Sequence, residues 1–206
     1  MLPSAAVSIA LRDLAGYRPA MLSVLENPEI RRRALPISVP AYHSMSQQGQ
    51  VEERAELIRG VIIGKMPKSP LHSRITSIIH RELMLALPGF WVRKEDPLTL
   101  ADSEPEPDIS IVPGRAEDYS AHPSTALVVV EVAVTSEELD REKIALYAEA
   151  GVGEYWLVLA HERAVEIHTG AKDGHWTNIR RITAGETLKA TVLPGVRLTL
   201  ADLFPA

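Results

Sequence analysis

The sequence contains no cysteine, and aromatic residues make up only 5% of its 206 residues. The lack of cysteine excludes disulfide scaffolds, thiolate zinc sites and cysteine nucleophiles, and it fits a reducing compartment, so we expect a cytoplasmic protein. The longest apolar run, residues 126–134, is interrupted by Glu131 and is shorter than a membrane span requires. We therefore expect no membrane partner. The N-terminus also lacks the features of a secretory signal.

Positive charge is also scarce, since 22 Lys and Arg residues stand against 27 Asp and Glu residues, for a net charge of -5. A chain of this charge does not attract polyanions over its whole surface, so any contact with nucleic acid must be local. A locally basic stretch runs from Arg54 to Lys94. An ordinary solvated surface with salt bridges is the simpler explanation of that stretch.

Hydrophobic residues at 46% and charged residues at 24% are the proportions of a globular protein, and the length suits one ordinary domain. We divide the chain into a helical or flexible N-terminal extension over residues 1–36 and one domain over residues 37–206. The alternation of strand and helix patterns in that domain predicts the α/β class.

Cap residues and apolar spacing predict helices over residues 38–49, 70–87 and 136–150. The middle helix opens with Ser69 and Pro70, and its expected apolar stripe includes Ile75 and Leu85. The strand, helix and strand across residues 126–159 form a crossover unit, which predicts a parallel pair in a mixed sheet. Strands are expected over residues 55–59, 61–66, 90–94, 97–100, 108–112, 126–134 and 154–159, with antiparallel additions over 163–169, 175–182 and 196–200.

Glu131 lies in the middle of the run ALVVVEVAV, which has the strongest pattern of a central strand. Alternation along a strand places Val130 and Val132 on one face and Val129, Glu131 and Ala133 on the other. A buried carboxylate without a partner is costly, so Glu131 needs a cation, a metal or a shifted pKa. The alternative is that Glu131 reaches solvent at the end of its strand.

Two further charged residues break their local patterns. Asp108 opens the strand DISIV, on the same face as Ser110 and opposite Ile109, although an Asp after Pro is most often a turn residue. Lys143 falls within the apolar stripe of its helix, one turn after Leu139; extension along the helix surface or a pair with Asp140 would also explain it.

Together, the two acids and the amine suggest metal-assisted hydrolysis of a phosphodiester. Asp108 and Glu131 would hold Mg2+ or Mn2+, because these ions prefer carboxylate oxygens and retain water ligands. Lys143 would orient or deprotonate the nucleophile, or bind phosphate. His72 and His80 are eight residues apart, which suits a shared ion poorly, so we interpret His72 as a helix-surface residue.

A series of segments resembles the Uma (Uma two) family of endonucleases, within the PD-(D/E)XK superfamily: ELIRG, SPLHSRI, SEPEPDISIV, VVVEVAVTS, DREKIALYAEAGVGEYWLV and LPGVRLTLADLF. The resemblance runs from Ile37 to Phe204. It implies a restriction-endonuclease-like fold, in which helices flank a mixed central sheet with added antiparallel hairpins. It also implies DNA as the partner and a homodimer, with no organic cofactor.

The resemblance also implies roles for individual residues. The PD of the superfamily is matched by Pro107 and Asp108, and its second acid by Glu131. Ala133 stands where the superfamily usually has its lysine, and the family is expected to supply that amine as Lys143. Glu56 resembles an additional acid of the family, either as a metal ligand or as a support for one, although an exposed hairpin carboxylate is an equally good reading.

The leading hypothesis is therefore a metal-dependent endonuclease that hydrolyses DNA. An alternative is a catalytically silent nuclease-fold module that binds nucleic acid or a partner protein. A third possibility is a phosphodiesterase acting on a small nucleotide. The net acidity and the scarcity of aromatic residues argue against strong non-specific binding of DNA.

Overall fold

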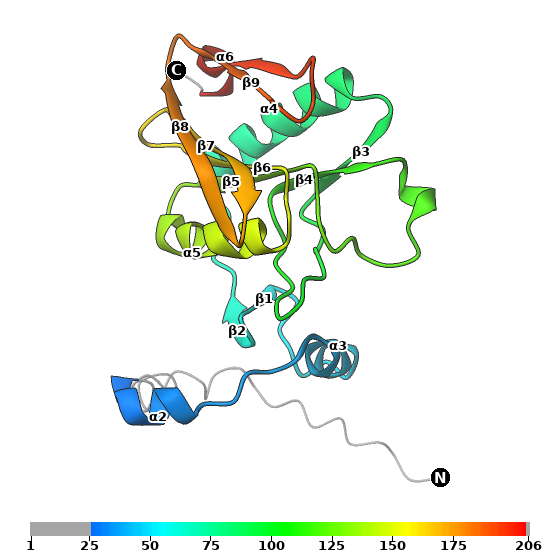
Figure 1. Cartoon of the computed structure of the whole chain (residues 1–206), viewed down its shortest axis with the longest axis vertical. Helices are drawn as coiled ribbons and strands as arrows, with labels where there is room; N and C mark the ends of the chain where they lie inside the picture. Colours follow the sequence, from blue (N-terminus) through cyan, green and yellow to red (C-terminus); the bar gives the residue numbers. More distant parts are fainter. Residues whose placement is uncertain (1–25, 205–206) are drawn as a thin grey trace. The chain divides into compact units, whose positions relative to one another are not determined.

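The computed structural model describes residues 26–204, and the chain divides after residue 36 into two compact units (Figure 1). In the first unit, helix α2 (Pro28–Arg33) begins after Asn27, whose side-chain oxygen accepts the backbone N–H of Glu29 at 3.0 Å. Residues 1–25 of the extension that we expect over residues 1–36 lie outside the described residues.

The second unit is built around a six-stranded mixed sheet with the order β3-β4-β5-β6-β7-β8 (Figure 1). Strands β5 and β6 are parallel, as the crossover pattern predicts, and every other neighbouring pair is antiparallel. The expected fold class, a mixed sheet flanked by helices, is confirmed. The strands are β3 (Phe90–Lys94), β4 (Ile109–Pro113), β5 (Val128–Ala133), β6 (Glu154–Leu159), β7 (Ala164–Lys172) and β8 (His175–Thr183).

Two small antiparallel sheets complete the strand content of the described chain. One is the hairpin of β1 (Ala55–Ile58) and β2 (Val61–Gly64). Its turn residues, Arg59 and Gly60, have φ angles of 51° and 75°, the left-handed values that a tight two-residue hairpin turn requires. The other pairs β9 (Thr187–Lys189) with β10 (Arg197–Thr199).

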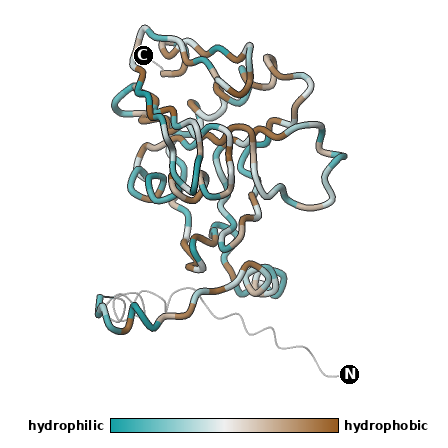
Figure 2. Tube along the Cα trace, in the orientation of Figure 1, coloured by the Kyte–Doolittle hydropathy of each residue, from teal (hydrophilic) through white to brown (hydrophobic). Residues whose placement is uncertain are grey.

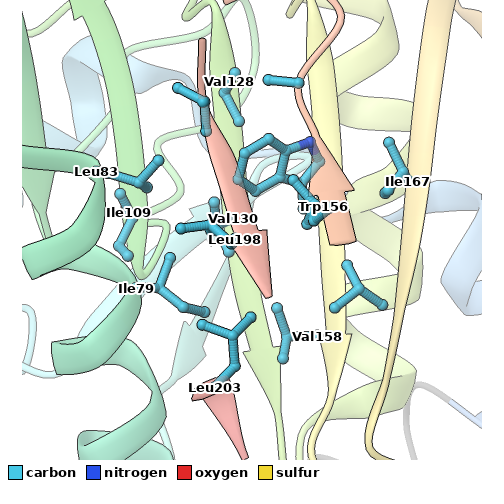
Figure 3. Packing of buried hydrophobic residues seen from close by; sticks show 14 of the residues in the cluster. Ile79, Leu83, Ile109, Val128, Val130, Trp156, Val158, Ile167, Leu198 and Leu203 are labelled. Carbon is cyan, nitrogen blue, oxygen red and sulfur yellow. The ribbon is translucent and has the colours of Figure 1, made fainter. Parts of the chain in front are cut away.

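Helices cover both faces of the central sheet. Helix α4 (Pro70–Ala86) and helix α6 (Leu200–Leu203) pack on the face that carries Val130, as Figure 3 shows for Ile79 and Leu203. Helix α5 (Glu137–Glu149) covers the opposite face. In Figure 2 the hydrophobic stretches gather along the central strands, whereas the tube is largely hydrophilic at α5.

Shorter elements lie at the margins. Helix α3 (Val39–Gln47) packs Tyr42 against Leu57 of β1, and a short 3-10 helix, η2 (Ala116–Asp118), follows β4. No helix between residues 26 and 204 is both long and apolar enough to cross a membrane.

The buried stripe of α4 differs from the expected one. Ile75, Ile79 and Leu83 are buried, whereas Leu85 is 73% exposed. Residues four apart lie on one face of a helix, so Leu83 continues the stripe of Ile75 and Ile79, and Leu85 lies on the far side. The bounds of the helix are close to those predicted, but the helix is oriented so that it buries Leu83 against the sheet in place of Leu85.

The strand expected over residues 97–100 is absent, and this segment is an irregular connection between β3 and β4. Pro97 has no backbone N–H to donate, and the N–H of Leu100 bonds to the carbonyl of Ser103 in a local turn at 2.9 Å. Leu98 and Leu100 are nevertheless buried against the α5 side of the sheet. Burial of alternate side chains, which produced the strand pattern, is here the result of a packed loop.

Candidate active site

The two predicted carboxylates lie side by side because β4 and β5 are antiparallel. Ile109 pairs with Val130, which places Asp108 opposite Glu131 on the sheet face covered by α5. The backbone N–H of Asp108 donates to Oε2 of Glu131 at 3.2 Å, and the N–H of Val132 donates to Oδ2 of Asp108 at 2.8 Å. Glu131 is 3% exposed, so the alternative of a solvent-exposed strand end is wrong.

Lys143 reaches this pair from α5. Its Nζ lies 3.2 Å from Oε1 of Glu131 and 2.9 Å from Oε1 of Glu56, and its side chain is buried. Glu56, in β1, is buried as well, which rules out the exposed hairpin carboxylate, and its Oε2 accepts the N–H of Glu106 at 3.2 Å. The structure therefore brings all four predicted site residues into one connected cluster.

Tyr147 is a further member of this cluster and was not among the predicted site residues. Its hydroxyl donates to Oε1 of Glu131 at 3.0 Å, and the residue is fully buried. Tyr147 lies four residues after Lys143 and so shares its helix face. That spacing, combined with the inward-facing lysine, is a signal that could have identified the tyrosine.

His72 also belongs to the site, and its interpretation as a helix-surface residue is wrong. Its side chain is only 12% exposed, and its Nε2 lies 3.0 Å from Oδ2 of Asp108. The position of α4 against β4 produces this contact, and no local pattern around His72 indicates it. The N-cap bond from the His72 N–H to Oγ of Ser69, at 3.2 Å, fixes the backbone at this point.

The cluster carries more negative than positive charge. Burial raises the pKa of Glu131; Lys143 offsets only part of this effect, and the neighbouring carboxylates of Asp140, Asp108 and Glu56 add to it. Burial by itself lowers the pKa of Lys143, but the carboxylates of Glu131, Glu56 and Asp140 together raise it well above its ordinary value. Lys143 is therefore a firmly protonated cation among acids that it does not fully neutralise.

These residues line a pocket that opens to solvent and encloses roughly 640 Å3 of space, including the solvent at its mouth. Two lysines of the loop between β2 and α4 stand in its wall. Lys65 pairs with Glu106, and Lys68 lies 2.8 Å from Oε2 of Glu95 and 4.0 Å from Oδ1 of Asp108. The pocket thus combines acids at its base with basic side chains in its wall.

The donor chemistry of the pocket fits a hard divalent cation. Asp108 and Glu131 present carboxylate oxygens in a buried region with excess negative charge, which a cation would compensate. Within residues 26–204, however, no three His, Asp or Glu side chains are grouped as a complete ligand set. Mg2+ usually keeps several waters and takes one or two protein carboxylates, so two acids suffice.

Comparison with solved structures supports the fold. The chain is similar to the crystal structure of "a putative nuclease belonging to DUF820 from Anabaena variabilis ATCC 29413", with a TM-score of 0.70 and 18% sequence identity. The alignment covers 82% of this chain and 98% of that one. No curated protein matched the chain.

Comparison with family models identifies the family. The Uma2 model, described as "Putative restriction endonuclease", matches residues 39–201. The matched range covers most of the region over which the sequence resembles that family, and the resemblance is confirmed. The chain belongs to the Uma2 family and has its restriction-endonuclease-like fold.

Proposed function

We propose that this protein is a metal-dependent endonuclease that hydrolyses phosphodiester bonds of DNA. The observation that carries the proposal is the meeting of Asp108, Glu131 and Lys143 in one open pocket, from two adjacent strands and one helix. The family description and the nuclease-like fold support the same function.

In this proposal, Asp108 and Glu131 hold Mg2+ or Mn2+. When bound, the ion supplies a Lewis acid that favours ionisation of a water ligand and offsets charge on the phosphate. Lys143 donates hydrogen bonds to the attacking water or to a phosphate oxygen. The contacts of its Nζ with the carboxylates of Glu131 and Glu56 favour the protonated amine, and so this role over that of a general base.

Glu56 and Tyr147 act through the catalytic groups. Glu56 accepts a hydrogen bond from Lys143 at 2.9 Å and so directs its ammonium group toward Glu131. Tyr147 donates to the same Glu131 oxygen that faces Lys143. This arrangement favours Glu56 as a positioning residue over the alternative of a metal ligand.

The proposal also covers the domain organisation, the partner and the oligomeric state. Residues 37–206 form the nuclease-like domain, and residues 1–36 are an extension to it. Lys65 and Lys68 lie where a nucleic-acid backbone would approach the pocket, which supports DNA as the partner. We further propose a cytoplasmic homodimer without an organic cofactor, since two sites would serve the two strands of a duplex.

A catalytically silent module that binds nucleic acid or a partner protein is the second candidate. One observation favours it: both oxygens of Glu131 already accept hydrogen bonds from Asp108, Lys143 and Tyr147. A carboxylate that is this well satisfied by protein donors has less capacity for a metal ion.

Nicking of supercoiled plasmid DNA in the presence of Mn2+ or Mg2+ distinguishes the two candidates. We expect cleavage by the unmodified chain, and loss of cleavage in Asp108→Ala and in Lys143→Ala. Asp102→Ala is the matched control, because Asp102 forms an exposed ion pair with Arg59 away from the pocket. Equal cleavage by all the proteins would reveal a contaminating nuclease, and DNA binding without cleavage would favour the silent module.

A further inference from the structure

His72 approaches Asp108 from a third element, the first turn of α4. A carboxylate oxygen only accepts hydrogen bonds, so the proton in the 3.0 Å contact between Nε2 of His72 and Oδ2 of Asp108 belongs to the imidazole. The cap bond from Ser69 fixes the His72 backbone, which limits the freedom of the ring. The contact is therefore built into the start of the helix.

The two oxygens of Asp108 have different surroundings. Oδ2 accepts two donors, Nε2 of His72 and the backbone N–H of Val132, at 3.0 and 2.8 Å. Oδ1 lies 4.0 Å from Nζ of Lys68, which is longer than a hydrogen bond. Two donors from different elements thus fix the rotation of the carboxylate and direct the other oxygen toward the wall of the pocket.

We propose that His72 is a positioning residue that holds Asp108 so that Oδ1 is the oxygen available to a divalent cation. The inference rests on the proposed function, since it assigns a role toward the ion that Asp108 would bind. His72 itself does not ligate the ion, because its Nε2 is committed to Asp108 and its Nδ1 is buried. Hydrogen bonds of this kind to ligands orient them and strengthen their binding of the metal.

The environment of Nδ1 separates this role from a purely structural one. Nδ1 of His72 is buried without a hydrogen-bond partner among the described residues. An unpaired buried polar atom destabilises a protein, and an apolar side chain of similar size would avoid that penalty. The unpaired Nδ1 of His72 therefore lowers the stability of the fold, and the hydrogen bond from Nε2 to Asp108 is the contact that an apolar residue could not make.

The inference is tested by titrating the metal-free chain with Mn2+ and following binding by calorimetry. We expect His72→Leu to bind Mn2+ about 10- to 100-fold more weakly, with a melting temperature equal to or above that of the unmodified protein. His72→Gln should recover most of the affinity, because its amide N–H can reach Asp108. The control is His80→Leu, which removes a part-buried histidine of the same helix that contacts the Val92 carbonyl.

The outcomes separate this inference from the proposed function. Unchanged Mn2+ affinity in His72→Leu, with Asp108→Ala impaired, would overturn the positioning role and leave the metal site intact. A lowered melting temperature that His72→Gln fails to restore would indicate a structural role instead. Direct nitrogen coupling to bound Mn2+ in pulsed electron paramagnetic resonance, lost in His72→Leu, would make His72 a ligand and overturn the inference. No binding by the unmodified chain would remove the proposed metal site itself.

Discussion

Nζ of Lys143 and Oε1 of Glu131 lie 3.2 Å apart, although twelve residues and a change from strand to helix separate them along the chain. Both side chains are almost completely buried. Two opposite charges removed from water stabilise each other only when their hydrogen bonds are satisfied, and here Glu56 and Tyr147 supply the further contacts. The stability of the fold and the chemistry of the pocket therefore depend on the same contact.

Replacing Lys143 by Met should destabilise the protein by about 3–5 kcal/mol, because Glu131 and Glu56 would remain buried without their cation. Urea unfolding at neutral pH measures this change. Arg81→Met serves as the control, since its exposed ion pair with Glu82 should contribute about 0–1 kcal/mol. If the two variants lost similar amounts of unfolding free energy, the claim that Lys143 compensates two buried carboxylates would be contradicted.

Tyr147→Phe should lower the free energy of unfolding by about 1.5–3 kcal/mol, since it removes a buried hydrogen bond to the Glu131 carboxylate. The ring remains, so the packing against Tyr155 is retained. The matched change is Tyr119→Phe, which removes a bond to the Pro113 carbonyl in an exposed position and should cost less. Chemical denaturation of the two variants compares them, and an unchanged stability in Tyr147→Phe would argue against the bond.

Leu83→Ala should destabilise the protein by about 2–5 kcal/mol, because Leu83 is fully buried between α4 and the sheet and its truncation leaves a cavity. Leu85→Ala, two residues later on the same helix, should change stability by less than about 0.5 kcal/mol because that side chain is largely exposed. Thermal or urea unfolding of the pair tests the orientation of α4. The reverse order of effects would show that the helix faces the sheet by its other side.

Acid should destabilise the protein partly through His168. Burial lowers the pKa of this imidazole, and Glu166 offsets the effect only in part. The unfolded chain therefore binds a proton near pH 6.5 that the folded chain resists. Stability from this group is complete above about pH 6.5 and is lost as pH falls through the lowered pKa of the folded state.

Urea unfolding at several pH values between 7 and 5 checks this dependence. His168→Phe should show a shallower fall in stability than the unmodified chain, since it keeps a ring between Tyr155 and Trp176 but cannot titrate. Glu131 and Asp140, whose pKa values are raised, act in the opposite direction in both proteins and cancel in the comparison. His175→Phe, at an exposed position, is the control for the loss of a histidine as such.

Much of the fold could be predicted because its signals are local. The caps and spacing around Ser69 and Pro70 fixed the start of α4, and the pattern of residues 126–159 predicted the parallel pair. The strand predicted over residues 97–100 is wrong, because alternate burial of Leu98 and Leu100 has the same pattern in a strand and in a packed loop. A hydropathy pattern indicates which side chains are buried, but a strand is defined by hydrogen bonds between backbone groups, which the pattern does not predict.

The sequence by itself determined that Glu131 and Lys143 carry charges where apolar residues were expected, since each interrupts a regular pattern along its own element. Only the tertiary structure decided that Tyr147 and His72 join them, and that Glu56 is buried beside Lys143. The physical reason is that a buried charged residue interrupts the apolar repeat of its own strand or helix, which can be seen in the sequence. The identity of its partners depends on how α4, α5 and the β1–β2 hairpin pack together.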